Sequence, residues 1–282
     1  MTSGIQNTAF GYKTLLSNTI GSANNAFGSY ALNNNTTGSG NTAVGYSSLR
    51  NNTTGANNSA FGLSALRYNT TGTLNSAFGY QSMFYNTVGN YNSAFGYRSL
   101  YSNTTGNNNT AVGYASLYNN TTNNNNAFGY KALLNNTTGT RNIAIGVGAL
   151  QANTIGNSNT AVGHNSLISN TTGDNNSAFG RYSLRYNITG QSNSAFGSNA
   201  LRLNTIGINN SAFGFYALRN NTTNNNSAFG YKALFANTTG PYNVAVGYLS
   251  LLSNNSGGYN TVVGYNTLSA NTFGGYNVAM GV

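Results

Sequence analysis

The sequence predicts an all-β fold, a single-chain parallel β-solenoid of about 17 coils, with about 17 residues and two short strands in each coil. Three observations predict it. One motif recurs from end to end at a nearly constant step, its apolar residues keep a fixed phase, and only 4% of the residues are charged, against roughly 25% in a typical domain. A unit that cannot bury its apolar face alone is typical of stacked coils that share one core.

The repeat is clearest at the alanine of the motif Asn-Ser-Ala-Phe-Gly. This alanine, or the valine that replaces it once, falls at positions 9, 26, 43, 60, 77, 94, 111, 127, 144, 161, 178, 195, 212, 228, 245, 262 and 279. The step is 17 residues, except for two steps of 16 that end at Ala127 and Ala228. Both short steps follow Asn-Thr-Thr-Asn-Asn-Asn, where the usual glycine is missing. The deletion is therefore expected in a turn, where a coil loses a residue most easily.

One unit reads Asn-Ser-Ala-Phe-Gly-Tyr-x-Ala-Leu-x-x-Asn-Thr-Thr-Gly-x-x. The segments Ser-Ala-Phe-Gly-Tyr and Ala-Leu-x-x are too short for helices, and their alternation predicts two strands with turns between them. Phe95, Leu100 and Leu117 are expected inside one continuous core, where each stacks on its counterparts in the neighbouring coils.

The constant polar and glycine positions predict how the coils join. The glycine after the first apolar segment, such as Gly113, is expected to adopt a positive φ or to allow a close backbone approach. Two asparagine positions do not vary along the chain, and Asn103 and Asn109 represent them. We expect their side chains to form amide ladders, in which each amide bonds its neighbour one coil along.

All of residues 1–282 are expected to form this one domain, without distinct caps. Residues 2–7 already fit the phase of the repeat, and residues 277–282 stop in the middle of a unit, so both ends are expected to present open β edges. Three outcomes are open for these edges: head-to-tail filaments, capping by neighbouring domains, or trimerisation that shields only the sides. Association of the chain with itself by stacking end to end is the favoured expectation.

The motifs Asn-Thr-Ala-Val-Gly and Asn-Ile-Ala-Ile-Gly-x-x-Ala-Leu resemble the head repeats of YadA-type trimeric autotransporter adhesins. Similar Asn-Thr-Ala-Val-Gly-Tyr arrays occur in phage and large-virus fibre-like proteins. The resemblance covers nearly the whole chain and implies a left-handed parallel β-roll, a homotrimer and attachment to host surfaces. It also implies an extracellular location, on a cell surface or in a virion fibre. The chain departs from the family in its longer unit and its Asn-Thr-Thr-Gly turn.

The composition argues against catalysis and metal binding. The chain has one histidine, His164, one acidic residue, Asp174, and no cysteine. It cannot supply a carboxylate pair or a Ser-His-acid set, and calcium-binding β-rolls need regularly spaced aspartates. We expect no enzyme activity, no catalytic residue, no metal and no cofactor. Because the apolar stretches are only a few residues long, no membrane insertion is expected.

The variable positions of the unit carry most of the charge. The net charge of +10 favours polyanionic partners. Most basic residues fall at two positions, one just after the constant leucine and one just after the tyrosine position, and tyrosines lie beside them. This candidate stripe for anions or glycans comprises Arg50, Arg67, Arg185, Arg202 and Arg219, then Lys13, Arg98, Lys131 and Lys232, with Tyr97, Tyr114, Tyr130 and Tyr231.

Arg185, Arg202 and Arg219 stand on successive coils, and without acids to relieve their repulsion they must be solvated or face an anion. The stripe can therefore be a solvated surface that keeps the protein soluble, a subunit interface, or a groove for acidic glycan, lipopolysaccharide phosphate or nucleic acid. The leading interpretation is a non-enzymatic structural fibre or adhesin module that attaches to glycans or a cell envelope. A self-assembling extracellular filament with a mechanical role is the alternative, and an ice-binding protein is the third.

Overall fold

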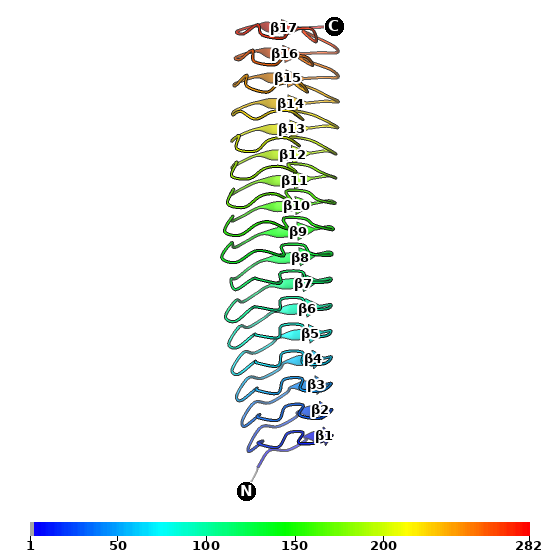
Figure 1. The fold of residues 1–282 in the computed structure, drawn as a ribbon, viewed down its shortest axis with the longest axis vertical. Coiled ribbons are helices and arrows are strands. Elements are labelled where there is room, and N and C mark those ends of the chain that lie inside the picture. The colour runs from blue at the N-terminus through cyan, green and yellow to red at the C-terminus, as the bar shows by residue number, and fades with distance from the viewer. Residues whose placement is uncertain (1–2) are drawn as a thin grey trace. The chain divides into compact units, whose positions relative to one another are not determined.

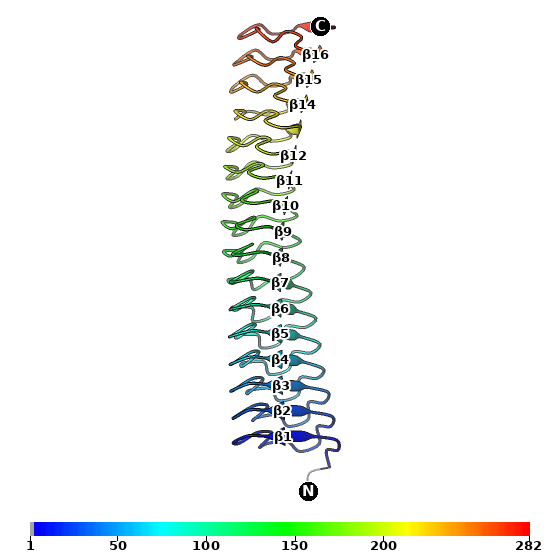
Figure 2. The same ribbon diagram turned by 90° about the vertical axis from the view of Figure 1, so that its right-hand side faces the viewer.

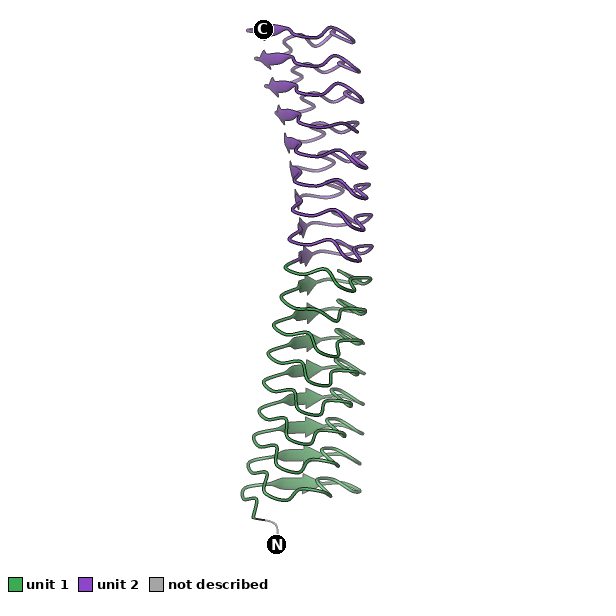
Figure 3. Cartoon of the chain, turned by 90° about the vertical axis from the view of Figure 1, so that its left-hand side faces the viewer, with its two compact units in different colours: residues 1–141 green, residues 142–282 purple. Residues whose placement is uncertain are grey.

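A computed structural model describes residues 3–282, and these contain short β-strands, turns and loops but no helix. They form two compact units, Met1–Arg141 and Asn142–Val282 (Figure 3). The part of the expected N-terminal phase that falls on Met1 and Thr2 lies outside the described residues.

Unit 1 is a stack of coils with one three-residue strand in each coil (Figure 1). Each strand pairs in parallel with the strand of the next coil, and the register joins equivalent residues, so that Ala60 lies beside Ala77 and Phe61 beside Phe78. Figure 2 shows these strands one above another, with the turn segments at their sides. The strands are β1 (Thr8–Phe10), β2 (Asn25–Phe27), β3 (Thr42–Val44), β4 (Ser59–Phe61), β5 (Ser76–Phe78), β6 (Ser93–Phe95), β7 (Thr110–Val112) and β8 (Asn126–Phe128).

Unit 2 repeats the same arrangement, again with parallel pairing in an equivalent-residue register, as between Ala195 and Ala212. Its strands are β9 (Ile143–Ile145), β10 (Thr160–Val162), β11 (Ser177–Phe179), β12 (Ser194–Phe196), β13 (Ser211–Phe213), β14 (Ser227–Phe229), β15 (Val244–Val246), β16 (Thr261–Val263) and β17 (Val278–Met280). The parallel β-solenoid predicted from the repeat is thus confirmed in both units.

The expected second strand of each coil is absent from the described residues, and turns take its place. In the coil that begins with β6, Arg98, Leu100 and Asn108 have φ angles of 49°, 53° and 57°. A left-handed backbone bends the chain sharply and costs about 1–2 kcal/mol for a residue other than glycine. These bends return the chain to its starting side within a short coil, so a second regular strand does not form.

The expected core is right for the leucines and wrong for the phenylalanines. Leu100 and Leu117 are completely buried, whereas Phe95 is 41% exposed. In a three-residue strand only the middle side chain points inward, and that residue is the alanine, such as Ala94, which is completely buried. Leucine, a small Ala or Ser such as Ser99, and two asparagines fill the rest of the interior, which leaves room for a methyl group but not for a ring.

The phenylalanines do stack on their counterparts, but on the outer face of the strands. The rings of Phe78 and Phe95 have centroids 4.9 Å apart and planes only 5° apart. In unit 2 the centroids of Phe179 and Phe196, and those of Phe196 and Phe213, are 4.7 Å apart. The phenylalanines therefore form an aromatic ladder on the outer face of the strands, whereas the sequence predicted that they would lie in the core.

The glycine after each strand is required by both its conformation and its surroundings, as predicted. Gly113 has a φ of 127°, and a Cβ atom there would lie 2.6 Å from the carbonyl oxygen of Gly129 in the next coil. Any side chain would therefore push two coils apart.

Two buried asparagine ladders run along each unit, as the constant positions predicted. Asn52 Nδ2 donates to Asn35 Oδ1 at 2.8 Å in one ladder, and Asn58 donates to Asn41 Oδ1 from its backbone N–H at 3.0 Å in the other. Both ladders also converge on one turn, because Gly55 O accepts hydrogen bonds from Asn41 Nδ2 at 2.9 Å and Asn52 Nδ2 at 2.8 Å. A Cβ on Gly55 would lie 2.4 Å from Asn52 Oδ1, so the turn admits only glycine.

The representatives of the two ladders lie where they were expected. Asn103 Nδ2 donates to Asn86 Oδ1 at 2.8 Å, and the Asn109 N–H donates to Asn92 Oδ1 at 3.0 Å. All four side chains are completely buried. The ladders therefore provide hydrogen-bond partners for buried amide groups, whose burial without partners would cost free energy.

The two 16-residue steps shorten a turn, as expected, and they interrupt one ladder. Asn120 Nδ2 donates to Thr122 O at 2.8 Å instead of reaching the preceding coil, and Asn103 Oδ1 is left buried without a hydrogen-bond partner. In unit 2, Asn221 Nδ2 donates to Thr223 O at 2.8 Å, and Asn204 Oδ1 is left in the same state.

We expect Leu100→Ala to lower the free energy of unfolding by about 2–5 kcal/mol, because it opens a cavity in a closed core. Phe95→Ala, five residues earlier in the same coil, should cost only about 1 kcal/mol, because it removes an exposed stacked ring. Denaturant unfolding of both variants, followed by circular dichroism, measures the difference. Equal losses would contradict the assignment of the two columns to opposite faces.

We expect Asn69→Asp to destabilise the protein by at least about 3 kcal/mol at neutral pH. The substitution removes the donors to Asn52 Oδ1 at 2.7 Å and Gly72 O at 2.9 Å and places a buried carboxylate against both oxygens. Burial and the two facing oxygens raise the pKa of the new carboxyl group in the folded state. Stability should therefore recover as the pH falls and the group is protonated. Thermal unfolding across pH measures this, with the exposed Asn57→Asp as control; similar unfolding curves for both variants would contradict it.

Candidate functional site

Two neighbouring columns of side chains leave the coil directly after the strand. In the coil of β6 the glycine turn at Gly96, with a φ of 133°, is followed by Tyr97 and Arg98. The backbone of Arg98 is left-handed, with a φ of 49°. The turn thus presents a tyrosine column and, beside it, the column that carries Lys13, Arg98, Lys131 and Lys232.

The predicted tyrosines form stacked ladders. Tyr97 and Tyr114 have ring centroids 5.1 Å apart, and Tyr114 and Tyr130 have centroids 5.2 Å apart, with planes within 17° of parallel. In unit 2, Tyr231 stacks on Tyr248 at 5.2 Å. One edge of each ring and its hydroxyl therefore remain available to solvent, while the faces contact neighbouring rings.

Arg98 is held against aromatic rings and is not freely solvated. Its guanidinium carbon lies 5.3 Å from the centroid of Tyr97 and 5.2 Å from that of Tyr101. Its Nε donates to Gln81 Oε1 at 2.8 Å. These contacts fix the Arg98 side chain beside the tyrosine ladder.

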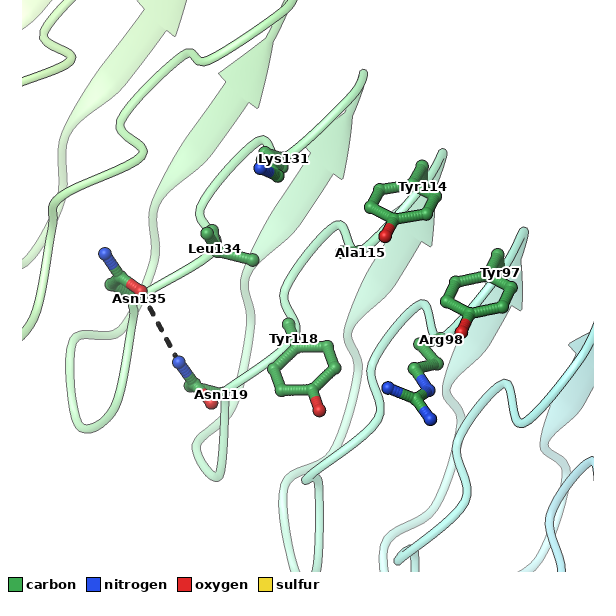
Figure 4. A pocket seen from close by; sticks show the side chains of 9 residues that line it. All are labelled: Tyr97, Arg98, Tyr114, Ala115, Tyr118, Asn119, Lys131, Leu134 and Asn135. Carbon is green, nitrogen blue, oxygen red and sulfur yellow. Dashed lines mark hydrogen bonds between the residues drawn. The ribbon is translucent and has the colours of Figure 1, made fainter.

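A pocket of about 310 Å³ opens between Arg98 and Lys131 (Figure 4). Arg98, Ala115 and Lys131 occupy three successive positions of one column, so Ala115 stands between the two basic residues. The pocket exists because Ala115 supplies only a methyl group where the neighbouring coils supply long basic side chains. With coils roughly 4.8 Å apart, the two cations flank a gap that spans about two coils.

The tyrosine ladder and a second row of side chains form the walls of this pocket. Tyr97 and Tyr114 line one side, and Tyr118, Leu134 and two asparagines line the other (Figure 4). Tyr118 stacks on Tyr101 at 4.9 Å, and Asn119 Nδ2 donates to Asn135 Oδ1 at 3.5 Å. The pocket therefore combines two cations with phenol hydroxyls and amides, a lining that suits a polar anionic ligand.

The arginines predicted to form a stripe in unit 2 separate into two aromatic-centred groups. Arg185 and Arg202 both lie over Tyr182, with guanidinium carbons 4.6 Å and 5.5 Å from its centroid. Arg219 instead lies over Tyr216 at 5.5 Å and Phe235 at 5.7 Å. The three cations are therefore partly packed on rings, and they do not form a uniform row.

The other predicted cations also pack on rings. In unit 1 the guanidinium carbons of Arg50 and Arg67 lie 4.8 Å and 5.4 Å from the centroids of Tyr30 and Tyr68. Lys13 Nζ lies 5.2 Å from the centroid of Tyr12. In unit 2, Lys232 Nζ lies 5.3 Å from Tyr231. Basic and aromatic side chains thus interleave as predicted, although in several separate places.

Two residues of the unit 2 group were not predicted. Arg181 occupies the tyrosine column, and Tyr182 occupies the next column, the one that carries Lys13, Arg98, Lys131 and Lys232 in other coils. The Arg181 guanidinium carbon lies 4.5 Å from the Tyr182 centroid, and Arg181 Nη2 donates to the Tyr182 hydroxyl oxygen at 3.1 Å. Aligning the units column by column would have exposed this exchange, because it reverses the usual order of aromatic and basic residues.

The pocket also contains residues that the motif search missed. Ala115, Asn119, Leu134 and Asn135 line it, but none of them stands out when basic and aromatic residues alone are followed. The available signal was the short side chain of Ala115 between two long ones in one column.

The electrostatic environment differs among the tyrosines. The hydrogen bond from Arg181, together with the charges of Arg181, Arg185 and Arg202, lowers the pKa of Tyr182. Burial and the neighbouring Tyr85 raise the pKa of Tyr101. Tyr182 is therefore a phenol whose ionised form is favoured by neighbouring arginines.

Within residues 3–282, no three His, Cys, Asp or Glu side chains come together as a metal site would require. The same residues include no helix with the length and hydrophobicity needed to cross a bilayer. No protein-family model matches the chain, and no curated protein matches it significantly.

We expect Arg181→Gln to raise the pKa of Tyr182 toward the usual value for tyrosine, because it removes both the hydrogen bond and a nearby charge. The Cζ chemical shift of labelled tyrosine, followed by NMR against pH, reports this ionisation. Arg50→Gln is the control, since Arg50 lies over Tyr30 in unit 1. An unchanged Tyr182 titration in Arg181→Gln would contradict the proposed cause.

Proposed function

We propose that this chain is a non-enzymatic structural repeat module of the fibre or adhesin type, which attaches outside the cell to acidic glycans of a cell envelope. The observation that carries the proposal is the pocket beside Ala115, where Arg98 and Lys131 flank a space of about 310 Å³ lined by phenols and amides. The resemblance of the coil motif to adhesin head repeats supports the same function.

The pocket fits a sugar acid by size and chemistry. Its volume lies at the lower end of the range of ligand sites, which begins at roughly 300 Å³, and suits one sugar residue of a polymer. The guanidinium of Arg98 can chelate a carboxylate with two parallel hydrogen bonds, and Lys131 adds a point charge. Asn119, Asn135 and the tyrosine hydroxyls can bond the sugar hydroxyls.

The repetitive surface favours a polymeric ligand over a free sugar. Basic residues recur elsewhere in unit 1 at Lys13, Arg50 and Arg67, each against a tyrosine. A long acidic polysaccharide can engage several such places at once, and each added contact raises the apparent affinity without a new specific pocket. The single acid of the chain, Asp174, offers little repulsion to such a polyanion.

We expect the full chain to bind desulfated chondroitin, whose uronic acids carry carboxylates, at least about tenfold more tightly than the carboxyl-reduced polymer, an energy difference of about 1.4 kcal/mol. Surface plasmon resonance at increasing salt should show weakening, since solvent-exposed charges are screened. Equal binding of the neutral polymer would contradict the proposal.

Filling the pocket should remove this preference. Ala115→Gln introduces a side chain that the same column already carries at Gln81, in a similar left-handed conformation, with φ angles of 51° and 52°. We expect it to reduce affinity for desulfated chondroitin at least about fivefold. Asn165→Gln, in the same column of unit 2, is the matched control and should leave binding unchanged; an unaffected Ala115→Gln would rule out this pocket.

A further inference from the structure

Three guanidinium groups surround one tyrosine ring in unit 2. The guanidinium carbons of Arg181, Arg185 and Arg202 lie 4.5, 4.6 and 5.5 Å from the centroid of Tyr182. Because all three lie within 5.5 Å of one point, no two of them can be farther apart than twice that distance. Arg181 and Arg185 belong to the coil of β11, and Arg202 comes from the coil of β12.

The chain itself supplies no counter-ion for this cluster. Its single acidic side chain is Asp174, and Asp174 Oδ1 accepts hydrogen bonds from the backbone N–H of Asn157 at 2.6 Å and from Asn157 Nδ2 at 3.3 Å. Arg202 Nε is buried and has no hydrogen-bond partner. Three cations held together without an acid repel one another, and an external anion relieves that repulsion.

The donors of the cluster suit an anion with three terminal oxygens. A carboxylate has two oxygens, and one guanidinium fork can satisfy both. A sulfate or phosphate ester offers three terminal oxygens, and three separate guanidinium groups can each address one of them. The Tyr182 oxygen already accepts a hydrogen bond from Arg181 Nη2 at 3.1 Å, so the hydroxyl proton can be donated to the same anion.

A sugar ring beside the ester would meet an aromatic surface. Tyr186 is 37% exposed, and its centroid lies 5.0 Å from the Arg185 guanidinium carbon. The Arg202 guanidinium carbon lies 5.9 Å from the same centroid, so the ring of Tyr186 adjoins two of the three arginines. A stacking surface next to an oxyanion site is suited to a substituted sugar, in which a ring and an ester lie side by side.

We propose that Arg181, Arg185 and Arg202 around Tyr182 form a second, separate site that recognises a sulfate or phosphate ester on a polysaccharide. This inference rests on the proposed attachment to acidic glycans and adds a chemical group that the Ala115 pocket does not select. It assigns carboxylate recognition to unit 1 and ester recognition to unit 2.

The test compares polymers that differ only in the ester. Chondroitin sulfate and its desulfated form share one backbone, and phosphomannan and its dephosphorylated form provide the phosphate pair. Surface plasmon resonance with the full chain should show at least about tenfold tighter binding of an esterified polymer than of its partner, the loss expected for several charge-assisted hydrogen bonds. The preferred pair distinguishes sulfate from phosphate. No preference in either pair would overturn the inference.

The variants localise that preference. The triple substitution Arg181→Gln, Arg185→Gln and Arg202→Gln should abolish it while leaving binding of desulfated chondroitin within about threefold, as expected for sites that share no residue. The control Lys13→Gln, Arg50→Gln and Arg67→Gln removes the same charge from unit 1, so it should weaken the binding of both polymers to a similar degree and retain the preference for the esterified one. Loss of preference in this control, or its survival in the first triple variant, would overturn the site.

Two further experiments distinguish loss of the site from loss of folding, and a glycan ligand from a nucleic acid. Replacing the same three arginines by lysine keeps the charge but removes the planar fork, so it should also lower the preference even if the glutamine variant fails to fold. A single-stranded oligonucleotide that binds the cluster as tightly as the esterified glycan would overturn the assignment to a glycan. Binding of esterified polymers alone, lost in the triple variant, would support this site while contradicting the carboxylate pocket.

Discussion

Buried asparagine amides hold each coil to the next, and the rest of the structure depends on them. A typical coil completely buries one large apolar side chain, such as Leu100, whose burial contributes about 1.5–3 kcal/mol. Amide bonds, each worth about 0.5–1.5 kcal/mol net, therefore provide a comparable share of the stabilisation. The shared acceptor at Gly55 ties both amide ladders to one turn, so the asparagine, the glycine and the length of the coil constrain one another.

With the interior filled by Ala, Leu, Asn and Gly, the larger aromatic and basic side chains must lie outside. The inter-coil register places equivalent positions one above another, so each exposed column becomes a row with a fixed interval. A substitution at one position of such a row then changes the surface locally. Ala115 creates a pocket between two cations, and the exchange of residue types at Arg181 and Tyr182 gathers three cations around one ring.

The repeat predicted the solenoid, the buried leucines, the amide ladders and the role of Gly113, because each depends on periodicity and on residue type alone. It failed for Phe95 and for the second strand, because a hydrophobic residue next to a small one does not reveal which of the two points inward. That choice depends on the width of the interior and on the left-handed backbone at Leu100. The site was only partly predictable for a similar reason: the cations were visible in the sequence, but the gap at Ala115 depends on neighbours 16 and 17 residues away.

The two shortened turns recur along the sequence at a much longer interval than the coils do. In a linear array, stability is close to a sum of nearest-neighbour couplings, and the coupling is weakened where Asn103 Oδ1 and Asn204 Oδ1 have no partner. Each unit contains one such fault, so cooperative unfolding or forced extension should pause there and divide the unit into segments. A single-residue deletion thereby limits how far a local loss of structure can spread along the coils.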